Sequence, residues 1–190
     1  MGIRSFLAFE IPLEIREKIE TIAKELKNLS LPVRWVRPEN IHLTIVFLGS
    51  VDQETIDSIK QRAQMVVNGF STFKIRLNCI GVFPNWRKPR VIWVGLDGDV
   101  ERLENLRNNL QEKLKSLGFL PEKRPFRAHI TLGRFKGPFA GDDKLKWIID
   151  KYHDINSNVN YLNELILFKS DLKPDGPVYA KMAVWPLKTG

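Results

Sequence analysis

A four-residue pattern, His-x-Thr-x, occurs twice in this chain of 190 residues and constrains its fold more than any other feature. The first copy spans residues 42–45 (His-Leu-Thr-Ile) and the second spans residues 129–132 (His-Ile-Thr-Leu), so they use two of the three histidines. Both copies lie in apolar runs typical of β-strands, in which side chains two positions apart share a face. The pattern therefore predicts two strands that each carry an imidazole and a hydroxyl on one face and aliphatic side chains on the other.

Chance explains this repetition poorly. The chain has six threonines, so a given histidine has Thr two positions later with a probability of roughly 3%. A lone histidine on an exposed strand face is usually only a surface residue. Because the pattern is repeated, we expect His42, Thr44, His129 and Thr131 to line one shared cleft.

Apolar periodicity and turn residues predict alternating strands and helices in each half of the chain. Strands are predicted at residues 5–11, 33–36, 41–48, 73–82, 90–96, 128–135, 162–168 and 178–185, and helices at residues 13–29, 52–68, 99–117 and 142–151. Each half has a strand, a helix, a turn and a tetrad strand that reaches a glycine, Gly49 or Gly133. We therefore predict one α+β domain over residues 1–190, with antiparallel sheets and with helices packed outside them. The two halves of this domain form an internal pseudo-twofold duplication.

The charge of the chain favours an anionic partner. Its formal net charge is +8 and its pI is near 9.6, which suits a polyanion such as nucleic acid. A lysine-rich surface that keeps the chain soluble explains the excess equally well. The arginines favour the first interpretation, because several lie near the tetrads: Arg34, Arg37, Arg124, Arg127 and Arg134.

Other features favour a cytoplasmic protein. The single cysteine, Cys79, excludes an internal disulfide and suits a reducing compartment. The N-terminal apolar run is interrupted by Glu10 and does not resemble a secretory signal. No apolar stretch approaches the ~18 residues of a membrane-spanning helix, so we expect a soluble monomer with no membrane partner.

Two imidazoles and two hydroxyls in one cleft suit phosphate chemistry. Histidine gives and accepts protons near neutral pH because its ordinary pKa is about 6.5. One imidazole can remove a proton from the attacking nucleophile while the other protonates the leaving oxygen. Threonine hydroxyls and an arginine can hold the non-bridging oxygens, where negative charge develops. This scheme needs no metal ion and no cofactor.

The tetrads and their surroundings resemble the paired signatures of the two-histidine (2H) phosphoesterase superfamily. The most specific similarity lies at residues 41–44 and 128–134, and it extends to residues 4–9, 34–36, 81–84 and 89–91. Within the superfamily the chain is most similar to the RNA 2′,3′-cyclic phosphodiesterases, first described as 2′-5′ RNA ligases. The resemblance implies a bilobal fold in which two antiparallel sheets surround a central groove. It also implies that the substrate is RNA with a 2′,3′-cyclic phosphate end, tRNA fragments included.

The resemblance further implies a role for each tetrad residue. His42 is the proton donor to the departing 3′ oxygen, and His129 is the proton acceptor that activates water. Thr44 and Thr131 hold the phosphate. The product of this reaction is a 2′-phosphate.

Two further residues implied by the resemblance conflict with the alternation of side chains in a regular strand. The family's phosphate-binding arginine corresponds to Arg134, and its aromatic residue near the nucleobase corresponds to Phe47. A regular strand directs both away from the histidine face and directs Arg127 toward it. A bulge or strand end at Gly133 would bring Arg134 to the histidine face. We therefore favour Arg134 over Arg127 as the phosphate-binding arginine and keep both as candidates.

Other residues lead to weaker hypotheses. His153 has no Thr partner and is expected at the surface, and Cys79 is expected to be a buried strand residue. A zinc site built from Cys79 and the histidines lacks closely spaced ligand pairs, so no metal site is expected. Trp86, in the basic loop 83–89, suits either contact with single-stranded RNA or an anchor to the core.

Three other functions remain open at this point. The same site suits a small cyclic phosphate, such as ADP-ribose 1″,2″-cyclic phosphate. It also suits the cleavage of 2′-5′ linkages, or their ligation by the same chemistry in reverse. A noncatalytic module that binds RNA ends is the alternative from a different class, and the two intact tetrads disfavour it.

Overall fold

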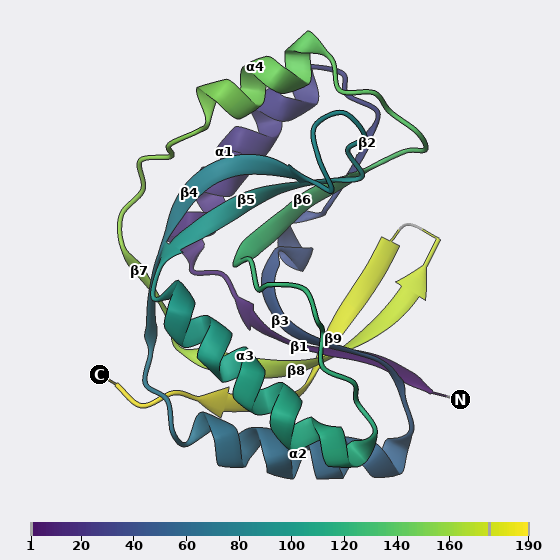
Figure 1. Ribbon diagram of the computed structural model, residues 1–190, viewed down its shortest axis with the longest axis vertical. Coiled ribbons are helices and arrows are strands. Elements are labelled where there is room, and N and C mark those ends of the chain that lie inside the picture. Colours follow the sequence, from purple (N-terminus) through teal and green to yellow (C-terminus); the bar gives the residue numbers. More distant parts are fainter. Residues whose placement is uncertain (1, 175, 190) are drawn as a thin grey trace.

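The computed structural model covers residues 2–174 and 176–189 and shows an antiparallel α+β fold (Figure 1). The strands of these residues are β1 (Ile3–Glu10), β2 (Val33–Trp35), β3 (His42–Val51), β4 (Phe73–Phe83), β5 (Val91–Gly98), β6 (His129–Phe135), β7 (Asn160–Leu162), β8 (Glu164–Lys173) and β9 (Gly176–Pro186). The α-helices are α1 (Leu13–Asn28), α2 (Gln53–Val67), α3 (Val100–Leu114) and α4 (Asp143–Lys151). Short 3-10 turns lie at Pro38–Asn40 and Lys115–Leu117.

The strands and helices predicted from the sequence are all present, with ends that differ by a few residues. Two helices are capped by an aspartate at their start: the Asp52 carboxylate accepts from the Thr55 N–H at 2.7 Å, and the Asp142 carboxylate accepts from the Leu145 N–H at 2.9 Å. Strand β7 was not predicted, because three residues at a sheet edge are too few to show a period.

The strands form a path of order β7-β4-β5-β6-β3-β1-β8-β9, and β2 pairs with the outer end of β6. Strands β3 and β6 are joined through one residue pair, Leu43 and Ile130. The path therefore has two parts, one made of β2 and β4–β7 and the other made of β1, β3, β8 and β9. Figure 1 shows the two parts diverging from the β3–β6 junction. The two antiparallel sheets that were expected are therefore joined into one sheet through a single residue pair.

The helices cover the outer sides of the two parts. In Figure 1, α1 and α4 lie along the β4–β6 part, and α2 and α3 lie beneath the β1–β3–β8 part. Each helix turns an apolar stripe inward, as amphipathic spacing predicts. In α3 the buried leucines are Leu103, Leu106, Leu110 and Leu114.

A second, smaller apolar cluster lies on the opposite side of the β1 part from the main core. It consists of Phe6, Ala8, Ile166 and Phe168, with Tyr179 packed against them. Strands β1 and β8 are thus covered on both faces, which explains their nearly continuous apolar sequences. This cluster forms the floor beside His42. No helix within the described residues combines the length and the apolar character that crossing a bilayer requires.

Candidate active site

The β3–β6 junction brings the two tetrads together. Leu43 and Ile130, the second residue of each tetrad, pair directly, and both side chains are 0% exposed in the core. Side chains alternate along a strand, so the histidines and threonines on either side of this pair project to the other face. Continuing the antiparallel register sets His42 beside Thr131 and His129 beside Thr44. The four residues predicted to share a cleft therefore lie together, all partly buried.

Both histidines are held in the same way. The Nδ1 of His42 lies 2.7 Å from the carbonyl oxygen of Asn40, and the Nδ1 of His129 lies 2.7 Å from that of Arg127. A carbonyl oxygen only accepts, so Nδ1 carries the hydrogen and donates it. This arrangement leaves Nε2 of each ring for a ligand, as a base when the ring is neutral and as an acid when it is protonated.

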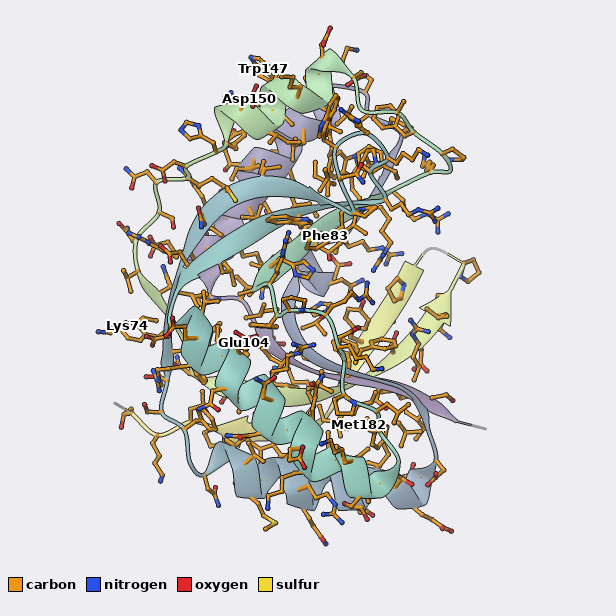
Figure 2. The ribbon with its side chains drawn as sticks, in the orientation of Figure 1. Lys74, Phe83, Glu104, Trp147, Asp150 and Met182 are labelled. Atoms are coloured by element: carbon orange, nitrogen blue, oxygen red, sulfur yellow. The ribbon has the colours of Figure 1, made fainter. Side chains whose placement is uncertain are left out.

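Aromatic rings fix the orientation of each imidazole. Phe6 and Tyr179 lie against His42 with ring centroids 4.8 and 5.3 Å away, the tyrosine edge-on. His129 packs edge-on against Phe83 at 5.0 Å. Phe83 ends β4 and lies beside β5 and β6 (Figure 2). These aromatic contacts restrict the rotamers of each imidazole and exclude water from it, which favours a defined geometry at Nε2.

The environment lowers the pKa of both histidines. For His42 the main cause is burial, which disfavours the charged ring, and the nearby His129 lowers its pKa further. Burial also lowers the pKa of His129, and the positive charge of Arg134 adds to this effect. The hydrogen bonds to the two carbonyl oxygens act in the opposite direction and are weaker. Burial and these positive charges therefore favour the neutral form of each ring.

A β-bulge follows the threonine in each tetrad strand. In β3, Val46 pairs with Leu7 and Thr44 pairs with Ala8, so Ile45 is an extra residue. In β6, Gly133 pairs with Ile92 and Thr131 pairs with Trp93, so Leu132 is the extra residue. An extra residue reverses the alternation of side chains beyond it.

The bulges place Phe47 and Arg134 on the histidine face, where a regular strand would not. Phe47 pairs with Phe6, whose ring contacts His42, and paired residues share a face. Arg134 lies close enough to His129 to lower its pKa. The tetrad strands are therefore not regular here, and alternation no longer conflicts with the positions that the resemblance implies for Phe47 and Arg134. The predicted break near Gly133 is present, one residue earlier, at Leu132.

Arg127 and Phe47 lie at the margins of the site. The guanidinium of Arg127 lies 5.9 Å from the centre of the Phe83 ring, and Arg127 is exposed just before β6. Phe47 is 57% exposed, with the Arg4 guanidinium 4.8 Å from the centre of its ring. Both side chains are thus exposed beside the tetrads.

Tyr179 of β9 is a site residue that the sequence did not reveal. Its ring contacts His42 and Phe6, and the charges of Arg134 and Arg4 act on its hydroxyl. Burial raises the pKa of this hydroxyl, and the two arginines partly oppose the effect. Tyr179 also lines a pocket beside His42, together with Phe168, Pro177, Val178 and Lys181. A lone tyrosine in a terminal strand carries no motif, so only the pairing of β9 with β8 brings it here.

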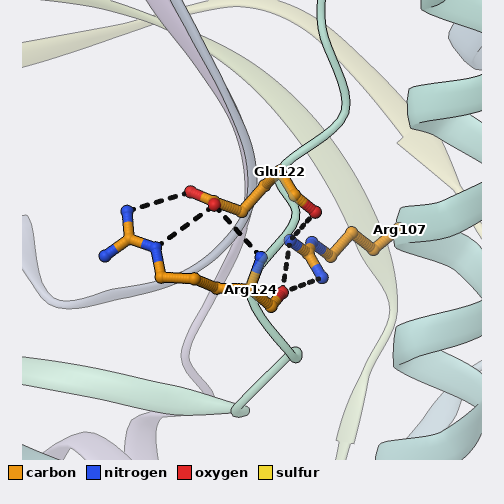
Figure 3. A network of polar contacts seen from close by, with 3 residues as sticks. All are labelled: Arg107, Glu122 and Arg124. Atoms are coloured by element: carbon orange, nitrogen blue, oxygen red, sulfur yellow. Dashed lines mark hydrogen bonds and ion pairs between the residues drawn. The ribbon is translucent and has the colours of Figure 1, made fainter.

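A buried arginine holds the segment that leads into β6. Arg107 of α3 is 6% exposed and donates to the carbonyl oxygens of Glu122 and Arg124 at 3.3–3.4 Å (Figure 3). The Arg124 guanidinium in turn forms an ion pair with the Glu122 carboxylate at 3.1 Å. This network fixes the backbone shortly before Arg127, whose carbonyl oxygen orients His129.

The remaining candidates lie apart from the tetrads. His153 is exposed, and its Nδ1 bonds the carbonyl oxygen of Asp150. Burial raises the pKa of the Cys79 thiol, which makes it a poor nucleophile. Among residues 2–174 and 176–189, no three His, Cys, Asp or Glu side chains gather closely enough to hold a metal ion. Trp86 is half exposed in the β4–β5 loop, with Arg87 beside its ring.

Comparison with known proteins identifies the same duplication. The model of the family described as "LigT like Phosphoesterase" matches residues 9–93 and again residues 94–179, and each match contains one tetrad. An RNA 2′,3′-cyclic phosphodiesterase of Archaeoglobus fulgidus is 39% identical over 96% of this chain and 99% of its own length. The enzyme of that name from Methanothermobacter thermautotrophicus is 34% identical over 98% of this chain and 100% of its own.

Solved structures agree with these matches. The crystal structure of a Thermus thermophilus protein superposes with a TM-score of 0.83 at 25% identity and covers 98% of this chain and 99% of its own. Escherichia coli LigT complexed with 3′-AMP superposes with a TM-score of 0.76 at 25% identity over 98% of this chain and 99% of its own.

Proposed function

Because this chain belongs to the LigT-like phosphoesterase family, we propose that it hydrolyses the 2′,3′-cyclic phosphate at an RNA end to a 2′-phosphate. The observation that carries the proposal is the direct pairing of the two tetrads at Leu43 and Ile130. This pairing sets two imidazoles and two hydroxyls around one space. Relatives that bear the name RNA 2′,3′-cyclic phosphodiesterase span nearly the same length.

In the proposed reaction, the histidines move two protons in opposite directions. His129 accepts a proton at Nε2 from a water molecule as the water oxygen bonds to phosphorus. The bond between phosphorus and the 3′ oxygen breaks, and His42 gives its Nε2 proton to that oxygen. The products are a 2′-phosphate monoester and a free 3′-hydroxyl. His129 ends protonated and His42 neutral, and exchange with solvent restores both.

The other site residues stabilise the charge that develops on the phosphate. Thr44 and Thr131 donate hydroxyl hydrogen bonds to the non-bridging oxygens, and Arg134 supplies a permanent positive charge. Arg127 is a second cation at the entrance, and Phe47 offers its exposed ring to a nucleobase. None of these steps requires a metal ion.

Substrate binding itself promotes protonation of His42, the proposed general acid. Burial and the neighbouring positive charges lower the pKa of both histidines and so favour their neutral forms. A bound cyclic phosphate brings one negative charge next to the rings, which raises their pKa. His42 then holds a proton when the 3′ oxygen is ready to receive it.

The proposed site requires both halves of the chain. Each half supplies one tetrad, so residues 1–190 act as one bilobal domain and a monomer is sufficient. The single cysteine suits the reducing cytoplasm, where RNA fragments with cyclic phosphate ends, including tRNA fragments, are the expected substrates.

Phosphorus NMR on an oligonucleotide with a 2′,3′-cyclic phosphate end, with EDTA present, tests this function. We expect the cyclic phosphate signal to be replaced by that of a 2′-phosphate. A 3′-phosphate product would reverse the assignment of the leaving oxygen. Binding without any turnover would instead indicate a noncatalytic module, and restoration of activity by added zinc would refute the metal-independent mechanism.

A further inference from the structure

Arg34 lies directly beside Arg134 on the neighbouring strand. Strand β2 pairs antiparallel with β6, and the register matches Arg34 with Arg134 and Val33 with Phe135. The register is fixed on both sides by backbone hydrogen bonds, from the Val36 N–H to Leu132 and from the Lys136 N–H to Pro32. By this pattern Arg34 and Arg134 form a hydrogen-bonded pair, with Cα atoms about 5.5 Å apart.

The two guanidinium groups project from the same side of the sheet. Val33 and Phe135, the adjacent pair, are both buried in the main core. Because side chains alternate along each strand, Arg34 and Arg134 point to the opposite side, and both are exposed. That side is the histidine face, since Arg134 acts on the pKa of His129.

This arrangement costs stability unless an anion occupies it. Like charges directly opposite each other on paired strands repel. Some arginines elsewhere in the chain have a carboxylate partner, as Arg76 has with Asp97. Within the described residues, neither Arg34 nor Arg134 has an ion pair or a side-chain hydrogen bond. Two adjacent uncompensated arginines at a proposed phosphate site point to a ligand that carries more than one negative charge.

The charge of the cyclic phosphate accounts for only one of these arginines. A 2′,3′-cyclic phosphate is a monoanion with two non-bridging oxygens, which Arg134 and the tetrad threonines already satisfy in the proposed function. Arg34 lies one strand further from His129, on β2. In a stacked nucleotide strand the next phosphate follows after a rise of about 3.4 Å, and further away in an extended strand. Two flexible side chains rooted about 5.5 Å apart match successive phosphates.

We propose that Arg34 binds the phosphodiester adjacent to the cyclic phosphate, so that the site selects oligonucleotide ends over mononucleoside cyclic phosphates. This inference rests on the proposed function and specifies its substrate class. Arg134 and Arg34 bind consecutive phosphates of one strand. A small cyclic phosphate occupies only the first of these positions.

The test compares two substrates in the Arg34→Gln variant. The substrates are uridine 2′,3′-cyclic phosphate and the uridine dinucleotide that ends in the same group. The ratio of kcat/KM for the dinucleotide to kcat/KM for the mononucleotide falls about tenfold or more, as expected for the loss of one charge-assisted hydrogen bond. Arg34→Lys retains most of the ratio, because it keeps the charge. Lys113→Gln, an exposed substitution on α3, removes one positive charge far from β2 and leaves the ratio unchanged.

Two outcomes overturn the inference. Equal losses for both substrates mean that Arg34 and Arg134 clamp a single phosphate. Unchanged kcat/KM for both substrates in Arg34→Gln means that Arg34 contacts no phosphate. Turnover of neither substrate by the wild-type protein would contradict the proposed function instead.

Binding measurements keep the inference testable without turnover. The probe is the uridine dinucleotide that ends in a 2′-phosphate, with uridine 2′-phosphate as the reference. For the dinucleotide, the slope of log Kd plotted against log salt concentration is smaller by about 0.7 in Arg34→Gln than in the wild-type protein. This difference is the value for one phosphate contact of a single strand. The slope for the nucleoside phosphate changes less. Equal slope changes for both probes contradict the second phosphate contact.

Discussion

Leu43 and Ile130 pair with each other where β3 meets β6, and each is the second residue of its His-x-Thr-x tetrad. An approximate twofold axis therefore passes between them, and equivalent positions face each other across it. The two histidines nevertheless have different neighbours. His42 lies between Phe6 and Tyr179, whereas His129 lies near Arg134. This asymmetry allows two equivalent residues to act as acid and base.

Replacing either His42 or His129 with alanine should reduce kcat about 10²- to 10⁴-fold, the usual contribution of one general acid or base. The measurement is the initial rate of hydrolysis of a cyclic phosphate end. His153→Ala is the matched control, because His153 is exposed and lies apart from the tetrads. It should keep the wild-type rate. Retention of more than about one tenth of the rate by either tetrad variant would contradict the two-histidine mechanism.

The pH dependence of kcat/KM should be a bell whose maximum lies below pH ~6.5, the ordinary histidine pKa. His129 must be neutral in the free enzyme, so the rate falls as the pH drops below its pKa. His42 must be protonated, so the rate falls as the pH rises above its own. Both pKa values are lowered, chiefly by burial, which moves both limbs to the acid side. A maximum on the alkaline side of neutrality would contradict these environments.

The variant Arg134→Gln should shift one limb of that bell. The charge of Arg134 lowers the pKa of His129, so its removal raises that pKa and moves the acid limb to higher pH. The pH profile of kcat/KM, normalised to its maximum, therefore becomes narrower. The absolute kcat/KM also falls, because the variant loses a phosphate-binding side chain. Arg124→Gln serves as the control, because Arg124 is exposed and paired with Glu122. An acid limb that does not move in Arg134→Gln would place Arg134 away from His129.

The sequence was sufficient to predict the tetrad strands and that their histidines and threonines lie together, but not the positions that follow them. Alternation in a regular strand assigns Phe47 and Arg134 to the wrong face. The extra residues Ile45 and Leu132 correct this in the folded chain. A bulge is set by the register with a neighbouring strand, so the local sequence does not specify it. Gly133 was the one local indication of such a break.

Long-range pairing explains what else could not be predicted. Tyr179 reaches His42 only because β9 pairs with β8, and Arg34 reaches Arg134 only because β2 pairs with β6. Neither pairing can be inferred from the sequences of the separate segments. Helix ends were predicted better, because a cap such as Asp52 acts on residues three positions away.

Gly133→Ala should destabilise the β2–β6 junction by about 1–3 kcal/mol, the usual cost of overpacking. A Cβ at this position would overlap the Cγ1 of Val33 and lie 3.0 Å from the carbonyl oxygen of Arg34. Urea unfolding measures the loss, and KM should rise because Arg34 and Arg134 are displaced. Gly69→Ala is the control, since its Cβ would meet only the Val66 carbonyl oxygen at 3.4 Å. Equal stability of the two variants would show that β2 does not pack closely on β6.

Arg107→Met should lower the free energy of unfolding by about 1.5–3 kcal/mol, because charge-assisted hydrogen bonds to two carbonyl oxygens are lost. Arg107 is 6% exposed, and methionine fills much of its volume without donating to Glu122 and Arg124 (Figure 3). The loosened segment leads to the carbonyl oxygen that orients His129, so kcat should fall while KM changes little. Urea unfolding and steady-state kinetics measure the two effects.

The control for Arg107→Met is Arg124→Ala, which removes the exposed half of the same network. The Arg124 side chain is 84% exposed, and its ion pair with Glu122 is screened by solvent. The backbone carbonyl oxygen of Arg124 still accepts from Arg107 after this substitution. Arg124→Ala should therefore leave both stability and kcat close to the wild-type values. Comparable losses in the two variants would mean that the exposed ion pair, and not the buried guanidinium, holds the segment before His129.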